Sequence, residues 1–150
     1  RQSENGTIKL KKLSKTASLF LITILHFSYP VFGWEEKALN KLKETKECAF
    51  CDLSGADLRW ANIYGAEIAG AANLVNANLQ GANLKDANLY GANLEGANLS
   101  GANLQGVNIN WASLYNANLQ GSNTHAVDFT GVTLCKTVMS DGTVNNINCR

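Results

Sequence analysis

An apolar–polar–apolar triplet recurs every five residues along most of this chain, from residue 51 to residue 134. The clean unit reads Ala-Asn-Leu-x-Gly, as in 92–96 and 97–101. A helix repeats its buried face every 3.6 residues and a strand every 2, so a period of five fits neither. Taking the large residue as the centre of each unit, the centres are Leu53, Leu58, Ile63, Ile68, Leu74, Leu79, Leu84, Leu89, Leu94, Leu99, Leu104, Ile109, Leu114, Leu119, Thr124, Phe129 and Leu134.

A short extended segment followed by a corner explains this period. The small residue and the centre are two apart, so both point inward while the Asn between them points outward. The two residues after the centre, the second often Gly, turn the chain, and Gly relaxes the backbone restriction there. A chain that turns the same way after every unit climbs as a solenoid, with about 4.8 Å between coils. The period therefore predicts a stack of coils.

These units resemble the pentapeptide-repeat family, whose pattern is Ala, Asn or Asp, Leu and two variable residues. The resemblance covers about residues 48–149. It implies an all-β fold, a right-handed quadrilateral parallel β-helix with four units per coil. The centres would then form four columns: Leu53, Leu74, Leu94, Leu114 and Leu134; Leu58, Leu79, Leu99 and Leu119; Ile63, Leu84, Leu104 and Thr124; Ile68, Leu89, Ile109 and Phe129.

Three departures from the pattern carry expectations of their own. Six residues separate Ile68 from Leu74, which predicts a local bulge at 69–72 that keeps the stack in register. Thr124 places a hydroxyl where Leu belongs, so we expect the last full coil to be the weakest. Phe129 is expected to fill the end of the core. The outward Asn residues are expected to hydrogen-bond along the rod as ladders.

The segments on either side of the repeats predict the domain organisation. Residues 1–33 carry five cations, one anion and an apolar run, which is typical of a cleaved signal peptide. An uncleaved anchor and a folded helix are the alternatives. Residues 34–47 predict an amphipathic helix that caps the first coil of the β-helix at 48–134; a partner-binding helix is the alternative. Residues 135–150 predict a C-terminal cap, with a hairpin turn at Asp141-Gly142.

The four cysteines predict two structural disulfides in an oxidising compartment. On a rod of four coils the two ends lie roughly 19 Å apart, so we expect Cys48 to pair with Cys51 and Cys135 with Cys149. The same separation argues against one four-cysteine zinc site. A redox-active Cys48–Cys51 pair would need a helix N-terminus beside the thiols.

The leader, the repeat start at residue 51 and the Met-x-Asp-Gly-Thr tail together look like the exported pentapeptide-repeat proteins of cyanobacteria and thylakoid lumens. We therefore expect a protein of the periplasm or the thylakoid lumen, with no stable membrane insertion once the leader is removed. We expect it to be a monomer or a weak dimer.

The sequence offers little for catalysis. The one His outside the leader, His125, has no acidic neighbour, and no Ser has a His or Lys partner arrangement. The carboxyl groups of Glu67, Asp86 and Glu95 fall on different sides or coils, so no paired-carboxylate site is predicted. We expect no enzyme activity, no cofactor and no metal.

Binding is the more open question. On the implied geometry Tyr90, Trp111 and Tyr115 fall close together and predict a patch for a protein partner. Trp60 and Tyr64 form a second candidate, which the preceding helix could cover. Nucleic-acid binding is not expected, because residues 51–134 contain two basic residues and six acidic ones. The sequence thus predicts an exported interaction or scaffold module. The alternatives are a DNA-mimicking topoisomerase inhibitor, as the resemblance suggests, and a thiol–disulfide redox protein.

Overall fold

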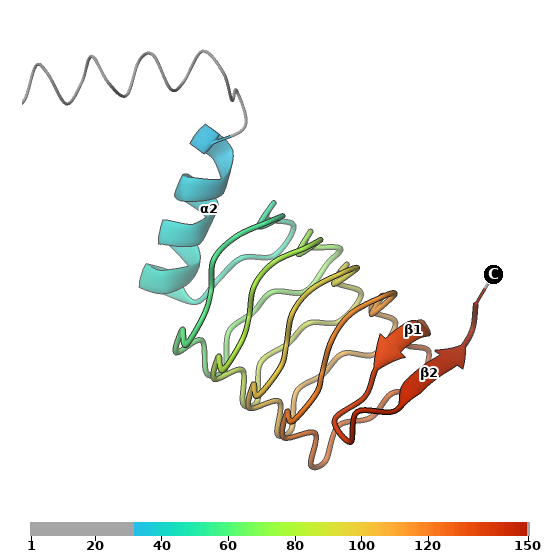
Figure 1. The fold of residues 1–150 in the computed structure, drawn as a ribbon. Coiled ribbons are helices and arrows are strands. Elements are labelled where there is room, and N and C mark those ends of the chain that lie inside the picture. The colour runs from blue at the N-terminus through green and yellow to red at the C-terminus, as the bar shows by residue number, and fades with distance from the viewer. Residues whose placement is uncertain (1–31, 150) are drawn as a thin grey trace, which may run out of the picture. The chain divides into compact units, whose positions relative to one another are not determined.

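The computed structural model describes residues 32–149, which form one helix, a stack of coils and a short hairpin (Figure 1). Helix α2 runs over Phe32–Thr45, strand β1 over Leu134–Val138 and strand β2 over Val144–Ile147. The predicted leader lies outside the described residues except for Phe32 and Gly33, which begin α2. No helix in the described part of the chain has the length and apolar character needed to cross a bilayer.

Parallel bridges between successive coils define four sides, as the resemblance to the pentapeptide-repeat family implies. Each bridge joins the outward residues of two neighbouring coils. The four rows are Asp52, Asn73, Asn93, Ser113 and Thr133; Asp57, Asn78, Asn98, Asn118 and Val138; Asn62, Asn83, Asn103 and Asn123; Glu47, Glu67, Asn88, Asn108 and Asp128. The fold is therefore a right-handed quadrilateral β-helix.

The extra residue in the first coil is absorbed without loss of register. The bridge from Glu47 to Glu67 spans 20 residues, whereas those from Asp52 to Asn73 and from Glu67 to Asn88 span 21. The insertion therefore lies between Glu67 and Asn73, where the sequence predicts it. Gly70 and Ala71 both have positive φ there, so two residues share a corner that one occupies elsewhere.

The centres form the core in the predicted columns. From Leu53 to Leu119 they are no more than 2% exposed. Cys48 and Met139, five residues before the first centre and five after the last, extend these columns. The N–H of Cys48 donates to Glu67 O, which is the bond that the centre of a unit makes to the next coil. Cys48 is fully buried and precedes Ile68 in its column. Met139 takes the corresponding place after Leu119, partly buried against the same core.

Each of seven outward Asn residues makes two side-chain hydrogen bonds; the seven are Asn73, Asn83, Asn88, Asn98, Asn103, Asn108 and Asn123. In each, Oδ1 accepts from the backbone N–H two residues on, as in Asn98 with Ser100 at 3.2 Å. The Nδ2 donates to the coil before, as in Asn123 to Asn103 at 3.1 Å. Asn therefore fixes the corner and links the coils, which confirms the expected ladder.

The second turn residue of each corner has positive φ, so Gly is common there. Phe50, Trp60 and Trp111 nevertheless adopt this conformation, with φ of 57–63°. Each packs its ring over a Gly at the same corner of the next coil: Gly70, Gly81 and Gly131 respectively. A Cβ on Gly70 would lie 2.7 Å from the Phe50 ring, so only Gly leaves room for the aromatic side chain.

Helix α2 packs against the first coil. Leu42 is fully buried in the core cluster, and Ala38 and Leu39 are partly buried against it. Trp60 and Tyr64, which the sequence left open to being covered by this helix, are 74% and 45% exposed. Both lie at corners, where side chains point away from the column that α2 covers.

The tail folds back as an antiparallel hairpin of β1 and β2, with the predicted turn at Asp141-Gly142 between them. The Cys135–Cys149 disulfide fastens its end. Thr137 is fully buried and donates its hydroxyl to Leu114 O at 2.7 Å. These contacts join the hairpin to the first and second sides of the last coil.

The last coil is less well packed than the others, as the sequence predicts. Thr124 and Phe129 are only half-buried. Ser122 occupies the position of the repeat's Ala, and its buried Oγ has no partner among the described residues. A buried hydroxyl without a partner costs about 1–3 kcal/mol.

The substitution Ser122→Ala is therefore expected to raise the free energy of unfolding by about 1 kcal/mol, since it restores the repeat residue and removes the unpaired group. Urea unfolding followed by circular dichroism measures this change. Ser100→Ala, at a half-buried corner, is the matched control and should change stability by less than about 0.5 kcal/mol. An unchanged or lowered midpoint for Ser122→Ala would show that the hydroxyl is satisfied.

Four aspartates have depressed pKa values for one shared reason. Arg59 holds the pKa of Asp57 down to about 2, through its side chain first and its backbone N–H second. The pKa values of Asp52, Asp128 and Asp141 are likewise lowered, first by the hydroxyl and then by the backbone N–H two residues on. Each ionised carboxylate thus stabilises its own corner.

Because these pKa values are lower in the folded chain, their contribution to stability is complete above pH ~4 and is lost as the pH falls toward 2. The melting temperature should therefore fall over this window. A variant with Asn at all four positions retains the side-chain acceptor for the corner N–H and should show a flatter pH profile. Parallel profiles for the two proteins would contradict this account.

Candidate functional site

Two aromatic side chains stand at the two ends of one face of the β-helix. Trp111 lies at the corner that precedes the first side of its coil, and Tyr115 lies at the corner that follows it. Trp111 is 66% exposed and Tyr115 is half-buried. The outward residue between them on this side is Ser113.

A groove of about 700 Å³ runs along this face. Its volume is within the range of ligand sites, roughly 300–1,000 Å³. It is lined by Glu95, Trp111, Ser113, Tyr115, Gly131, Thr133, Cys135 and Asn148. The structure thus brings Trp111 and Tyr115 together, as the sequence predicts. Tyr90, the third predicted member of the patch, is 47% exposed at the corner one coil before Trp111 and is not part of the lining.

The floor of the groove consists of short hydroxyl side chains. Ser113 and Thr133 continue the row that begins with Asp52, Asn73 and Asn93. They are shorter than the Asn they replace, and neither can donate an amide to the coil before. Among the described residues of this row the ladder has one bond, from Asn73 Nδ2 to Asp52 at 3.0 Å, and Ser113 and Thr133 lie beyond it in the lining of the groove.

Hydrogen-bond donors along the groove have no partner within residues 32–149. This holds for the indole N–H of Trp111 and for the hydroxyls of Tyr115, Ser113 and Thr133, none of which bonds to another described residue. Asn148 uses its Nδ2 on Val132 O at 3.2 Å. The groove therefore offers both apolar ring faces and donors.

The two ends of the groove carry opposite charges. Glu95 lies one coil before Tyr115, and no ion pair to its carboxylate occurs in the described part of the chain. Lys136 lies one coil after Tyr115, with its Nζ 5.7 Å from the centre of the Tyr115 ring. A ligand with a cationic end would therefore prefer the Glu95 end.

A second group of aromatic residues lies in the first coil. Phe50 is 78% exposed inside the Cys48–Cys51 loop, and Trp60 and Tyr64 lie at the second and third corners after it. The Nζ of Lys46 donates to Tyr64 O at 3.0 Å and lies 5.6 Å from its ring centre. Trp60 and Tyr64 flank Asn62 on the third side as Trp111 and Tyr115 flank Ser113 on the first, whereas Phe50 lies at another corner.

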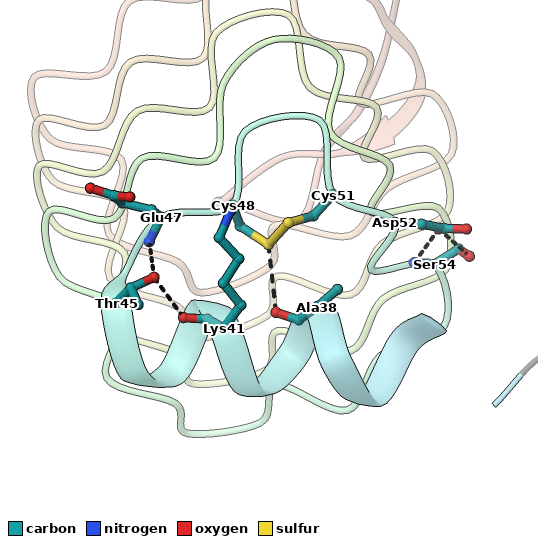
Figure 2. The surroundings of a disulfide bond; sticks show 8 residues. All are labelled: Ala38, Lys41, Thr45, Glu47, Cys48, Cys51, Asp52 and Ser54. Atoms are coloured by element: carbon teal, nitrogen blue, oxygen red, sulfur yellow. Dashed lines mark hydrogen bonds between the residues drawn. A yellow bond between two sulfur atoms is a disulfide. The ribbon is translucent and has the colours of Figure 1, made fainter. Parts of the chain in front are cut away.

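The Cys48–Cys51 pair is a disulfide, with Cys48 buried against α2 (Figure 2). Its Sγ lies 3.6 Å from the carbonyl oxygen of Ala38, in the middle of the helix. A thiolate is stabilised by a helix N-terminus or a cation, whereas a carbonyl oxygen presents negative charge. The contact that Cys48 makes is therefore not one that stabilises a thiolate.

The other predicted candidates remain isolated from one another. His125 is exposed at a corner, and Glu67 accepts a hydrogen bond from Asn88 Nδ2 at 2.8 Å. Among residues 32–149 no group of three or more His, Cys, Asp or Glu side chains could hold a metal ion. Four Asp carboxylates accept hydrogen bonds from the side chain and the backbone N–H of the residue two positions on, so they already have partners within their own corners.

Sequence reasoning did not identify Glu95, Ser113, Thr133 and Asn148 as members of the site. The two hydroxyl residues were visible as breaks in the Asn pattern. Asn148 was not, because it reaches the groove only through the folding of the tail and the Cys135–Cys149 disulfide.

Comparisons with known proteins agree with the observed architecture. A pentapeptide repeat protein from the thylakoid lumen of Arabidopsis thaliana is similar, with 29% identity over 67% of this chain and 70% of that one and a TM-score of 0.61. HetL, involved in heterocyst differentiation regulation in the cyanobacterium Nostoc, is 24% identical over 66% of this chain and 55% of its own, with a TM-score of 0.51. No curated protein matches the sequence. The family model of pentapeptide repeats matches residues 48–71, 72–110 and 112–148, so the chain belongs to the pentapeptide repeat family.

Proposed function

We propose that the protein is a non-catalytic interaction module that presents the Trp111–Tyr115 groove to a partner protein, with Tyr90 at its margin. The observation that supports this most is the groove itself, with two aromatic walls above a floor of unpaired hydroxyls. Aromatic side chains with a polar handle are enriched at the centres of protein interfaces. Repeat proteins of this type bind protein partners.

A rigid scaffold makes such a surface effective. Fully buried centres and the Asn ladder hold each corner in one conformation. Binding then costs little ordering of the protein, so more of the contact energy appears as affinity. The corner side chains vary freely because they do not enter the core.

The surroundings of His125 and of the Cys48–Cys51 pair support a non-catalytic role. His125 stands alone, and Cys48 and Cys51 are joined to each other next to a carbonyl oxygen. The DNA-mimic alternative has less support, since two basic residues accompany the six acidic ones of the repeats and several of the acids bond to their own corners. We regard the interaction module as the better hypothesis.

We also propose that the protein is exported, to the periplasm or a thylakoid lumen. The basic and apolar leader, the two disulfides and the similarity to a protein of the thylakoid lumen support this. The helix that carries the proposed cleavage site begins at Phe32, so cleavage before Trp34 would leave all but its first two residues in place.

Intact mass of the protein purified from the cells that produce it tests this export. We expect a chain that starts at or near Trp34 and takes up no alkylating reagent until it is reduced, after which four thiols react. A chain that retains the leader and has four reactive thiols before reduction would contradict export.

Photo-crosslinking in those cells tests the interaction. A photoreactive amino acid at position 115 should give a discrete cross-linked species, and Trp111→Gly in the same chain should reduce its yield by about tenfold. A photoreactive residue at position 64, the Tyr of the other aromatic group, is the control. Equal yields from positions 115 and 64, or no dependence on Trp111, would argue against the groove as the contact site.

A further inference from the structure

The C-terminal end of the rod has the shape of a step. After the fourth coil the chain passes once more along the first and second sides, where bridges to Thr133 and Val138 hold the segment that contains β1. Strand β2 then pairs with the other edge of β1 (Figure 1). The third and fourth sides end with Asn123 and Asp128. The first and second sides are therefore two strands longer than the third and fourth.

The two shorter sides end in a strand edge. In the middle of the rod the N–H of each centre donates to the next coil, as Leu104 does to Asn123 O at 2.9 Å, and the carbonyl of the small residue accepts from it, as Ala102 does. Within residues 32–149 the corresponding groups of the last coil have no hydrogen-bond partner: the N–H groups of Thr124 and Phe129 and the carbonyls of Ser122 and Val127. Such an edge is a template for pairing with another strand.

The core is open at the same end. Thr124, Val127 and Phe129 are half-buried, whereas the centres from Leu53 to Leu119 are no more than 2% exposed. Ile147 lies opposite Leu134 in the hairpin and therefore on its core face, yet Ile147 is 57% exposed. Exposed apolar residues next to an unpaired strand edge indicate an interaction surface.

The occupant of this edge has to turn a corner. Thr124 and Phe129 lie on two sides that meet at Ala126, which has a φ of +58°. A straight strand could pair with one of these sides but not with both. Strand β2 has the required bend, because it pairs with β1 before and after the corner at Lys136. It is also an edge strand, since β1 is its one strand neighbour in the described part of the chain.

We propose that two copies of the protein associate end to end, with β2 of each copy completing the third and fourth sides of the other. A two-fold axis perpendicular to the rod, through the corner between the second and third sides, exchanges the second side with the third and the first with the fourth. Strand β2 then runs parallel to residues 122–129 of the other copy, as successive coils run parallel to each other. The two steps interlock, because the longer sides of each copy fill the space beyond the shorter sides of the other.

This arrangement satisfies the groups that one copy leaves without partners. The N–H groups of Thr124 and Phe129 donate to carbonyls of β2 in the other copy, and Ile147 enters the end of the core beside Phe129 of that copy. The opposite end of the rod is covered by α2, whose Leu42 is fully buried in the core. The association therefore closes at two copies and does not continue as a filament.

Analytical ultracentrifugation of the disulfide-bonded protein, isolated from the cells that produce it, tests this dimer. We expect one species of twice the chain mass at about 100 µM protein, which dissociates on dilution. Ile147→Glu places a charge in the apolar contact and should raise the dissociation constant about tenfold or more. Tyr64→Glu is the matched control, since Tyr64 is 45% exposed in the first coil, and it should sediment as the natural protein does.

Thr124→Pro tests the strand pairing itself. Its missing N–H has no partner in a single copy, so the variant loses only the 3.4 Å contact of Thr124 Oγ1 with Ser140 Oγ and should keep its circular dichroism spectrum. It should nevertheless raise the dissociation constant about tenfold or more. In the natural protein, amide hydrogen exchange at residues 124 and 129 should slow as the concentration rises. In Ile147→Glu it should stay fast.

Four outcomes would overturn the inference. They are a monomer at every concentration, growth beyond the dimer, a dimer in which exchange at residues 124 and 129 does not change, and a dimer that Tyr64→Glu weakens as much as Ile147→Glu does. The groove on the first side has no part in this experiment, so a monomeric protein would leave the proposed function standing.

Discussion

The fold depends on hydrogen bonds that each coil makes to its neighbours. Within a coil the backbone makes only short corner bonds, such as Ala77 N–H to Leu74 O. The bonds that build the sides run between coils, from Leu94 N–H to Ser113 O and from Ser113 N–H to Ala92 O. A coil without a neighbour is therefore unsatisfied, which is why the two ends of the rod are structurally unlike its middle. Helix α2 packs on one end, and the β1–β2 hairpin joins two sides of the other.

This dependence explains how much the sequence could predict. The spacing of the centres was sufficient to place the compensated insertion near Ala71. The four columns needed in addition the four units per coil that the family resemblance implies. The positions of Cys48 and Met139 in those columns were missed, since they lie beyond the last recognisable units and no repeat residue marks them. The exposure of Trp60 was also left open by the sequence, because the path of α2 is set by burial of Leu42 and not by any local pattern.

The candidate site lies where residues are not needed for the fold. Inward residues and the outward Asn row are committed to the fold, so surface properties can change mainly at the corners and where the Asn row is interrupted. Ser113 and Thr133 interrupt it on the side that Trp111 and Tyr115 flank. On the geometry that the family resemblance implies, the sequence predicted that Trp111 and Tyr115 lie close together. It could not predict Asn148, whose place in the groove depends on the path of the tail.

Backbone conformation at the corners does not by itself mark a site. Phe50, Trp60 and Trp111 all take the positive φ that Gly adopts most easily, and each is followed by Gly at the same corner of the next coil. The unfavourable conformation costs of order 1 kcal/mol or more, and packing of the ring on Gly offsets part of it. Because all three corners share this arrangement, it is a general way for this fold to hold an exposed ring in a fixed orientation. What distinguishes Trp111 is the free hydroxyl floor beside it, so the case for function rests on the combination of ring, donors and groove.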